Sequence, residues 1–229
     1  MWLELANISI LCTTFCLIDR GLSRYTAFDG IYYLIHSLNN AAIVVLTGEE
    51  VFRSLTDFTY VQNSPKNILA LQFVFALHLY HLIVYWKKFR YDDWLHHLLM
   101  IGIALPIGWI TESNSLLGYS LFFTTGFPGG IDYFLLFLTR NYWMSRETEK
   151  KVNAYLNTWI RSPGCISHAT LSVLLISAKT TSYSFEWFLG IIASILTFWN
   201  GQYFMRQVIE NNILFSEWRK KSDVSSDII

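Results

Sequence analysis

Long apolar segments, separated by short polar ones, follow one another along almost the whole chain. A helix needs about 20 apolar residues to cross the hydrocarbon core of a bilayer. The pattern predicts seven such helices, at about residues 3–18, 31–46, 67–86, 94–110, 116–138, 166–178 and 186–205. We therefore expect an all-α membrane protein in which about seven transmembrane helices form a bundle or barrel, as one domain over residues 1–229.

The basic residues divide unequally between the two sides of this predicted bundle. When the segments between the helices are assigned to alternate sides, one side holds 14 basic residues and the other only Arg53, Lys66 and Lys179. Positive residues are enriched on the cytosolic side of membrane proteins. We therefore expect a lumenal or outer amino terminus and a cytosolic carboxyl terminus.

The composition agrees with a membrane protein and excludes some other classes. Apolar residues make up 53% of the chain and charged residues 15%, whereas a soluble domain carries roughly 25% charged residues. The net charge of zero gives no basic bias toward nucleic acid, so we expect no nucleic-acid partner. The three cysteines lie in apolar stretches, and their odd number is not typical of a disulfide framework.

The connection between the fifth and sixth predicted spans contains a helical pattern of its own. Its apolar positions recur at helical spacing, and they are Val152, Tyr155, Leu156, Trp159 and Ile160. This pattern predicts an amphipathic helix that lies in the cytosolic interface or packs on the underside of the protein. We expect Pro163 and Gly164 to end it, and we expect residues 222–229 to be a disordered tail.

Polar side chains gather at one depth of the predicted bundle, in its cytosolic half. Groups of this kind are costly inside a membrane, so they usually face a cavity or one another. They are His36, His78, His81, His96, His97, Asp132, His168 and Asn200. A single histidine is often a helix-to-helix hydrogen bond, but the shared depth favours a polar chamber that opens toward the cytosol.

The spacing around the histidine pair suggests a chemical role for it. Asp92 and Asp93 precede His96 and His97 by four residues, which places each carboxylate beside an imidazole on one helix face. Such a pair suits general acid or base chemistry. The same two acids could instead cap the helix that follows.

Two segments resemble a known family of membrane proteins. The run YHLIVYWKKFRYDDWLHH at residues 80–97 and the run ILTFWNGQYFMRQVIENN at residues 195–212 resemble the TLC-domain family, over a core of about residues 28–218. The family includes ceramide synthases, which transfer an acyl group from acyl-CoA to a sphingoid amine in the endoplasmic reticulum. It also includes non-synthase members linked to membrane lipid composition.

The resemblance implies residue roles, a co-substrate and a location. It maps His96 and His97 onto the catalytic pair and Asp132 onto the acid of the next helix, with acyl-CoA as co-substrate and no bound cofactor or metal. The synthases carry a His-Asp and a further Asp where this chain has one acid after Pro128-Gly129-Gly130, which favours a non-synthase member. The Pro-Gly-Gly run should kink this helix or allow close packing.

Other interpretations stay open. The run LHLYH at residues 77–81 is similar to the histidine box of fatty-acid elongases, but the next position is Leu82. A transporter would place polar residues in the lumenal half as well, where the chain has few.

We expect a role in membrane lipid metabolism or homeostasis, either by acyl transfer or by non-catalytic lipid binding. The partner is a membrane lipid or acyl chain, a homodimer is compatible with the sequence, and His78, His81, Asp93, His168 and Asn200 are expected to bind substrate.

Overall fold

The computed structural model describes residues 2–111, 116–179 and 185–226. Within these ranges the chain forms helices and no strand. They are α1 (Trp2–Tyr25), α2 (Ile31–Thr56), α3 (Phe58–Asn63), α4 (Ile68–Tyr85), η1 (Trp86–Lys88), α5 (Tyr91–Leu99), η2 (Met100–Ala104), α6 (Leu105–Ile110), α7 (Leu116–Leu121), η3 (Phe122–Gly126), α8 (Phe127–Arg140), α9 (Arg146–Leu156), η4 (Asn157–Arg161), α10 (Ser162–Lys179) and α11 (Phe185–Ser226). The chain is therefore an all-α membrane bundle, as the apolar pattern predicts.

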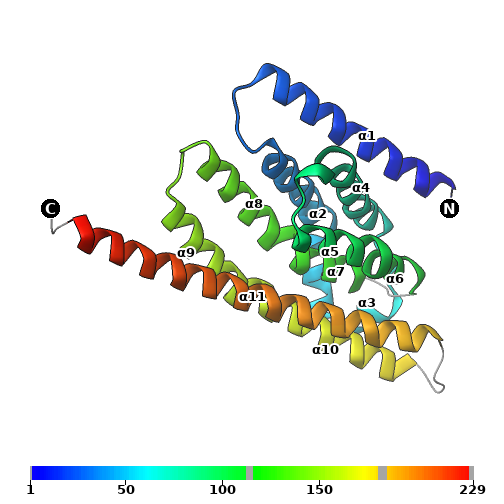
Figure 1. Cartoon of the computed structure of the whole chain (residues 1–229). Coiled ribbons are helices and arrows are strands. Elements are labelled where there is room, and N and C mark those ends of the chain that lie inside the picture. Colours follow the sequence, from blue (N-terminus) through cyan, green and yellow to red (C-terminus); the bar gives the residue numbers. More distant parts are fainter. Residues whose placement is uncertain (1, 112–115, 180–184, 227–229) are drawn as a thin grey trace.

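The helices pack against one another, and α1 and α11 lie on opposite sides of the bundle (Figure 1). Six helices of the described chain are long and apolar enough to cross a membrane. The predicted sixth span corresponds to α10, which is not among these six and packs along α11. The structure thus contains the seven predicted helices, and six of them have the length and hydropathy of a span.

Three of the passes contain a short π-helical stretch, and each stretch is followed by a proline at the same distance. The stretches η2, η3 and η4 end two residues before Pro106, Pro128 and Pro163. A proline removes one backbone hydrogen bond and clashes with the carbonyl four residues earlier. That carbonyl lies within the π-helical turn in each case, so the wider turn accommodates the proline without ending the helix.

The helix predicted between the fifth and sixth spans differs from expectation. Pro163 and Gly164 do not end it, because α9, η4 and α10 form one continuous helix. Its exposed face carries Tyr155 and Trp159, and its buried face carries polar side chains. The helix α9 packs against the last part of α11, so this segment is joined to the bundle along its polar face.

The last helix is much longer than a membrane requires. At 42 residues α11 spans about 63 Å, twice the roughly 30 Å of a hydrocarbon core. Its carboxyl-terminal part extends beside α9 (Figure 1). The helix also includes residues 222–226, where we expected a disordered tail, and residues 227–229 lie outside the described residues.

The distribution of side chains is that of a protein surrounded by lipid. Large apolar side chains such as Leu17, Val45 and Ile83 are more than 60% exposed. Polar side chains such as Asn40 and Gln72 are buried inside. Polar groups that cannot face hydrocarbon turn toward one another. The candidate functional side chains of this bundle are therefore in its interior.

Two contacts fix the helices around that interior. Gly129 and Gly130 of α8 lie so close to α2 that an added Cβ would come within 3.0 Å and 3.3 Å of Asn40. The Pro-Gly-Gly run therefore permits close helix packing, one of its two predicted roles. At the other side of α4, the carboxylate of Asp19 accepts hydrogen bonds from Tyr80 and Tyr85, which ties α4 to α1.

Candidate functional site: a cluster of five histidines

Five histidines from three helices converge in the interior. The neighbouring ring centroids lie 5.2–6.3 Å apart. The cluster consists of His36 on α2, His78 and His81 on α4, and His96 and His97 on α5. His96 is exposed and the other four are buried, so His96 lies at the edge of the cluster.

The contact between α4 and α5 is made by two imidazoles. The Nε2 atoms of His78 and His96 lie 3.3 Å apart. His78 donates through Nδ1 to the carbonyl oxygen of Val74 at 2.8 Å, because a carbonyl can only accept. In a neutral imidazole the other nitrogen then carries the lone pair. The Val74 carbonyl therefore fixes the tautomer of His78 and directs its Nε2 lone pair at His96.

The start of α5 determines where the histidine pair lies. The carboxylate of Asp93 accepts from the backbone N–H of Arg90 at 2.9 Å and faces the Arg90 guanidinium at 3.5 Å. Asp93 thus caps the helix, the second of its two predicted roles. Phe89 stacks on His97 with ring centroids 4.6 Å apart. The cap and the stacked ring hold the first turns of α5 against α4.

A second half of the cluster rests on α2 and α8. His36 and Tyr133 are stacked with centroids 3.5 Å apart and an angle of 9°. The Nδ1 atom of His36 lies 3.2 Å from the Asn40 amide nitrogen, and Asn40 accepts from Thr125 at 3.1 Å. His81 packs against the ring of Tyr32. Aromatic rings and amides therefore close the deep side of the histidine cluster.

Asp132 belongs to a different polar cluster, between α8 and α9. The charged and polar groups around it are Glu149, Lys150, Asn153 and Arg161. Arg161 is 6% exposed and hydrogen-bonds Asn157 at 2.8 Å. Within the described part of the chain, no hydrogen bond or ion pair joins Asp132 to His96 or His97, so the structure does not bring the three catalytic candidates into one hydrogen-bonded group.

The two remaining predicted residues lie elsewhere. His168 on α10 is buried beside Tyr119 and lies 3.3 Å from the hydroxyl of Ser172. Asn200 is on α11, where its buried side-chain oxygen has no hydrogen-bond partner among the described residues. Of the six histidines predicted at one depth, five therefore form the cluster and His168 lies outside it.

The polar face of α9 was not predicted. Polar residues recur there every four positions, at Glu149, Asn153, Asn157 and Arg161, and all four are buried. This spacing places them on one helix face. The signal was present in the sequence, but the apolar face of the same helix suggested that its polar side was solvated.

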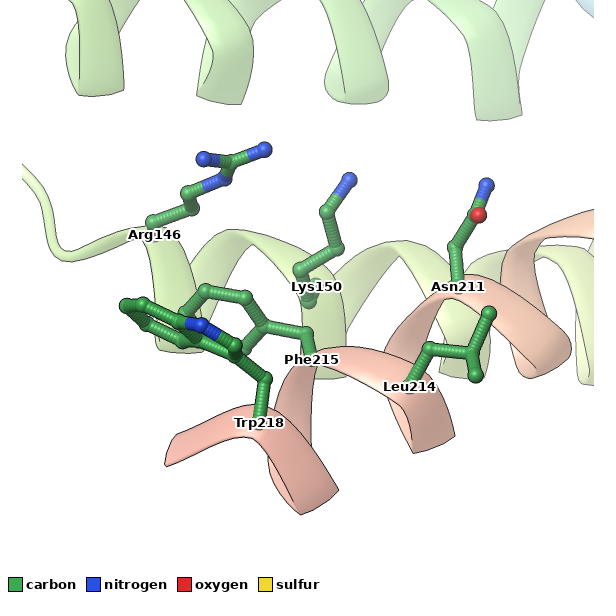
Figure 2. A pocket seen from close by; sticks show the side chains of 6 residues that line it. All are labelled: Arg146, Lys150, Asn211, Leu214, Phe215 and Trp218. Carbon is green, nitrogen blue, oxygen red and sulfur yellow. The ribbon is translucent and has the colours of Figure 1, made fainter. Parts of the chain in front are cut away.

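An open groove of about 480 Å³ lies between α9 and the extended part of α11. Its lining residues are Arg146, Lys150, Asn211, Leu214, Phe215 and Trp218. Figure 2 shows Arg146, Lys150 and Asn211 pointing to the same side of the groove. The Arg146 guanidinium lies 5.6 Å from the centre of the Phe215 ring. The groove therefore combines two cations with an apolar aromatic surface.

The histidine cluster and the groove are the two candidate functional sites of this membrane bundle. The cluster offers several buried imidazoles of defined orientation, and the groove offers cationic groups at one end of the molecule. No family model, curated protein or solved structure matches this chain.

Proposed function

We propose that this protein acts on membrane lipids, and that its chemistry is acyl transfer from acyl-CoA to a lipid or amine acceptor. The observation that supports this proposal is the contact between His78 and His96, at the exposed edge of a buried imidazole cluster. A general base needs an orienting partner and access to its substrate. His96 combines both.

The tautomers assign the base. The Nε2 lone pair of His78 accepts the Nε2 proton of His96, which leaves the lone pair of His96 on Nδ1. This Nδ1 removes a proton from the amine or hydroxyl of the acceptor while that group attacks the thioester carbonyl. The carbon–sulfur bond then breaks, and the leaving thiolate takes the proton from His96. The products are an amide or ester and free CoA, and His78 stabilises the transient imidazolium.

The other predicted site residues have supporting roles in this proposal. His97 is stacked on Phe89 and positions α5, and His78 and His81 line the cluster behind His96. Asp132 neighbours Tyr133, which stacks on His36, so Asp132 acts on the cluster through α8 and does not touch the reacting atoms.

The location follows from the charge pattern and the resemblance. The 14 basic residues on one side make that side cytosolic, and cytosolic acyl-CoA would reach His96 from there. The endoplasmic reticulum is the proposed compartment, and a non-synthase relative of the TLC-domain family is the proposed affiliation. A homodimer remains part of this proposal.

Reconstitution of the protein into vesicles with labelled acyl-CoA and a panel of amine and lysolipid acceptors tests the reaction. Removing a positioned base typically lowers the rate by about 10²- to 10⁴-fold. We therefore expect His96→Gln to reduce turnover by about this much. His168→Gln is the control, because the structure places this buried histidine outside the cluster, on α10 beside Ser172. Turnover that survives when His96 and His97 are both replaced by Ala would exclude the pair from the mechanism.

The groove between α9 and α11 favours a second function, non-catalytic binding of lipid. Two cations beside Phe215 and Trp218 suit an anionic head group above an apolar chain. Binding to vesicles with and without anionic lipid tests this alternative. We expect Arg146→Ala with Lys150→Ala to weaken binding to anionic vesicles, whereas Lys87→Ala with Lys88→Ala leaves it unchanged. Lipid binding without turnover on any acceptor would favour this function.

A further inference from the structure

Three histidines at the junction of α4 and α5 are arranged as metal ligands. The ligand atoms of His78, His96 and His97 all lie within 4.8 Å of one another. We propose that these three imidazoles bind one divalent transition-metal ion, for which Zn²⁺ is the best match. Neither the lipid chemistry nor the family resemblance requires such a site.

The spacing of the first two ligands already fits a metal. Zinc–nitrogen bonds are about 2.0–2.1 Å long, so two nitrogens on a tetrahedral zinc ion lie about 3.3–3.4 Å apart. The Nε2 atoms of His78 and His96 lie 3.3 Å apart. The third ligand, His97, neighbours His96 in sequence, and its ligand atom already lies within 4.8 Å of the other two, so a rotation of its ring can bring the nitrogen into coordination distance.

The surroundings of His78 support the same assignment. Metal-binding histidines usually donate their other ring N–H to a carbonyl or carboxylate, which fixes the tautomer and raises the basicity of the ligand nitrogen. His78 makes this contact to the Val74 carbonyl at 2.8 Å. Its Nε2 therefore carries a lone pair that points toward the other two ligands.

The remaining imidazole nitrogens also indicate a ligand. Three ring nitrogens have no hydrogen-bond partner among the described residues: both nitrogens of His81 and the Nδ1 of His97. His81 is 1% exposed, and buried polar atoms of this kind are normally satisfied. The His81 ring lies 5.3 Å from that of His97. An ion held by three imidazoles keeps a fourth position open.

The ligand set determines the class of ion. Calcium and magnesium prefer oxygen ligands, whereas imidazoles suit zinc, copper, nickel and cobalt. The nearby carboxylate of Asp93 is held by the backbone and the guanidinium of Arg90. Three nitrogen ligands therefore select a borderline-soft divalent ion.

Metal and proton compete for the same lone pair. In the metal-free state the Nε2 of His78 accepts the proton of His96, and in the bound state that lone pair coordinates the ion. A bound ion therefore occupies the nitrogens on which the proposed acyl transfer depends, and it should suppress that reaction. Metal binding can be measured without any turnover. A failure of the metal site therefore does not disprove acyl transfer, and a failure of acyl transfer does not disprove the metal site.

The test uses the purified full-length protein in nanodiscs, prepared with an affinity tag that contains no histidine and stripped of metal with a chelator. Titration with Co²⁺, followed by its visible absorption, and displacement by Zn²⁺ give stoichiometry and affinity. We expect one ion per chain, with the visible spectrum of Co²⁺ bound by nitrogen ligands in a four-coordinate site. His78→Gln and His97→Gln should each weaken binding at least about 10- to 100-fold, the loss seen when even an outer-shell partner is removed.

His168→Gln is the matched control, since His168 is buried outside the cluster and its replacement should leave affinity unchanged. Melting temperatures of all variants verify that they are folded. The stoichiometry and the Co²⁺ spectrum need no variant, so they test the site even if a cluster variant does not fold. Binding below one ion per chain, or equal affinity of the His78 and His168 variants, would overturn the site.

Discussion

His78 and His96 face each other through their Nε2 atoms at 3.3 Å, although 18 positions separate them in the sequence. Both sit on helix segments next to a short connection: His78 lies seven residues before the end of α4, and His96 lies five residues after the start of α5. The return of the chain after η1 therefore places both imidazoles at the same depth. This contact supports both the proposed base and the proposed metal site.

The orientation of the chain can be tested with terminal tags. The seven predicted helices would place the two ends of the chain on opposite sides of the membrane, and the basic residues predict that the carboxyl-terminal side is cytosolic. In sealed microsomes we expect protease to remove a carboxyl-terminal tag and to leave an amino-terminal tag intact until detergent is added. Equal protection of both tags would contradict an odd number of crossings.

Asp19 should contribute strongly to the packing of α1 on α4. Asp19→Ala leaves the buried hydroxyl of Tyr80 without its acceptor, and an unsatisfied buried group costs about 1–3 kcal/mol. We expect a lower melting temperature in detergent. Adding Tyr80→Phe to this variant should recover part of the loss, because it removes the unsatisfied group. Asp29→Ala, at an exposed position, serves as the control and should change little.

Arg161 should be needed for the polar contact between α8 and α9. Removing one partner of a buried charge cluster leaves the others uncompensated and costs about 3–5 kcal/mol. We therefore expect Arg161→Met to lower the melting temperature strongly, and Asp132→Asn in the same chain to restore part of it. Lys151→Ala, which removes an exposed ion pair with Glu147, should cost no more than about 1 kcal/mol. A single variant as stable as the double variant would argue against this cluster.

Gly164 should be required for the approach of α10 to η3. An added Cβ would overlap the ring of Phe123, and forcing extra atoms into a packed contact typically costs about 1–3 kcal/mol. Gly164→Ala should therefore lower the melting temperature. Gly48→Ala is the matched control, because a Cβ there meets no atom within 4 Å and alanine favours a helix by up to about 1 kcal/mol. Stabilisation by both substitutions would show that α10 is not packed as described.

The sequence by itself determined the class of the fold and the approximate place of each span. Helices in lipid must satisfy their own backbone hydrogen bonds, so apolar length is sufficient to identify them. The depth of the polar residues was also readable, because distance along a helix converts directly into depth. For this reason the sequence could predict that His78, His81 and the His96–His97 pair lie close together, although it also placed Asp132 in that group.

Only the tertiary structure decided which polar groups touch. Depth leaves the rotation of each helix and the order of neighbours open, and these depend on packing between helices. Asp132 and Tyr133 are adjacent in the chain, yet packing separates their partners. Tyr133 stacks on His36, whereas Asp132 lies near Arg161. Packing also let the helix continue past Pro163, because the π-helical turn before the proline accommodates the missing hydrogen bond. Local sequence signals cannot reveal such compensation, since the contacts that stabilise it come from other helices.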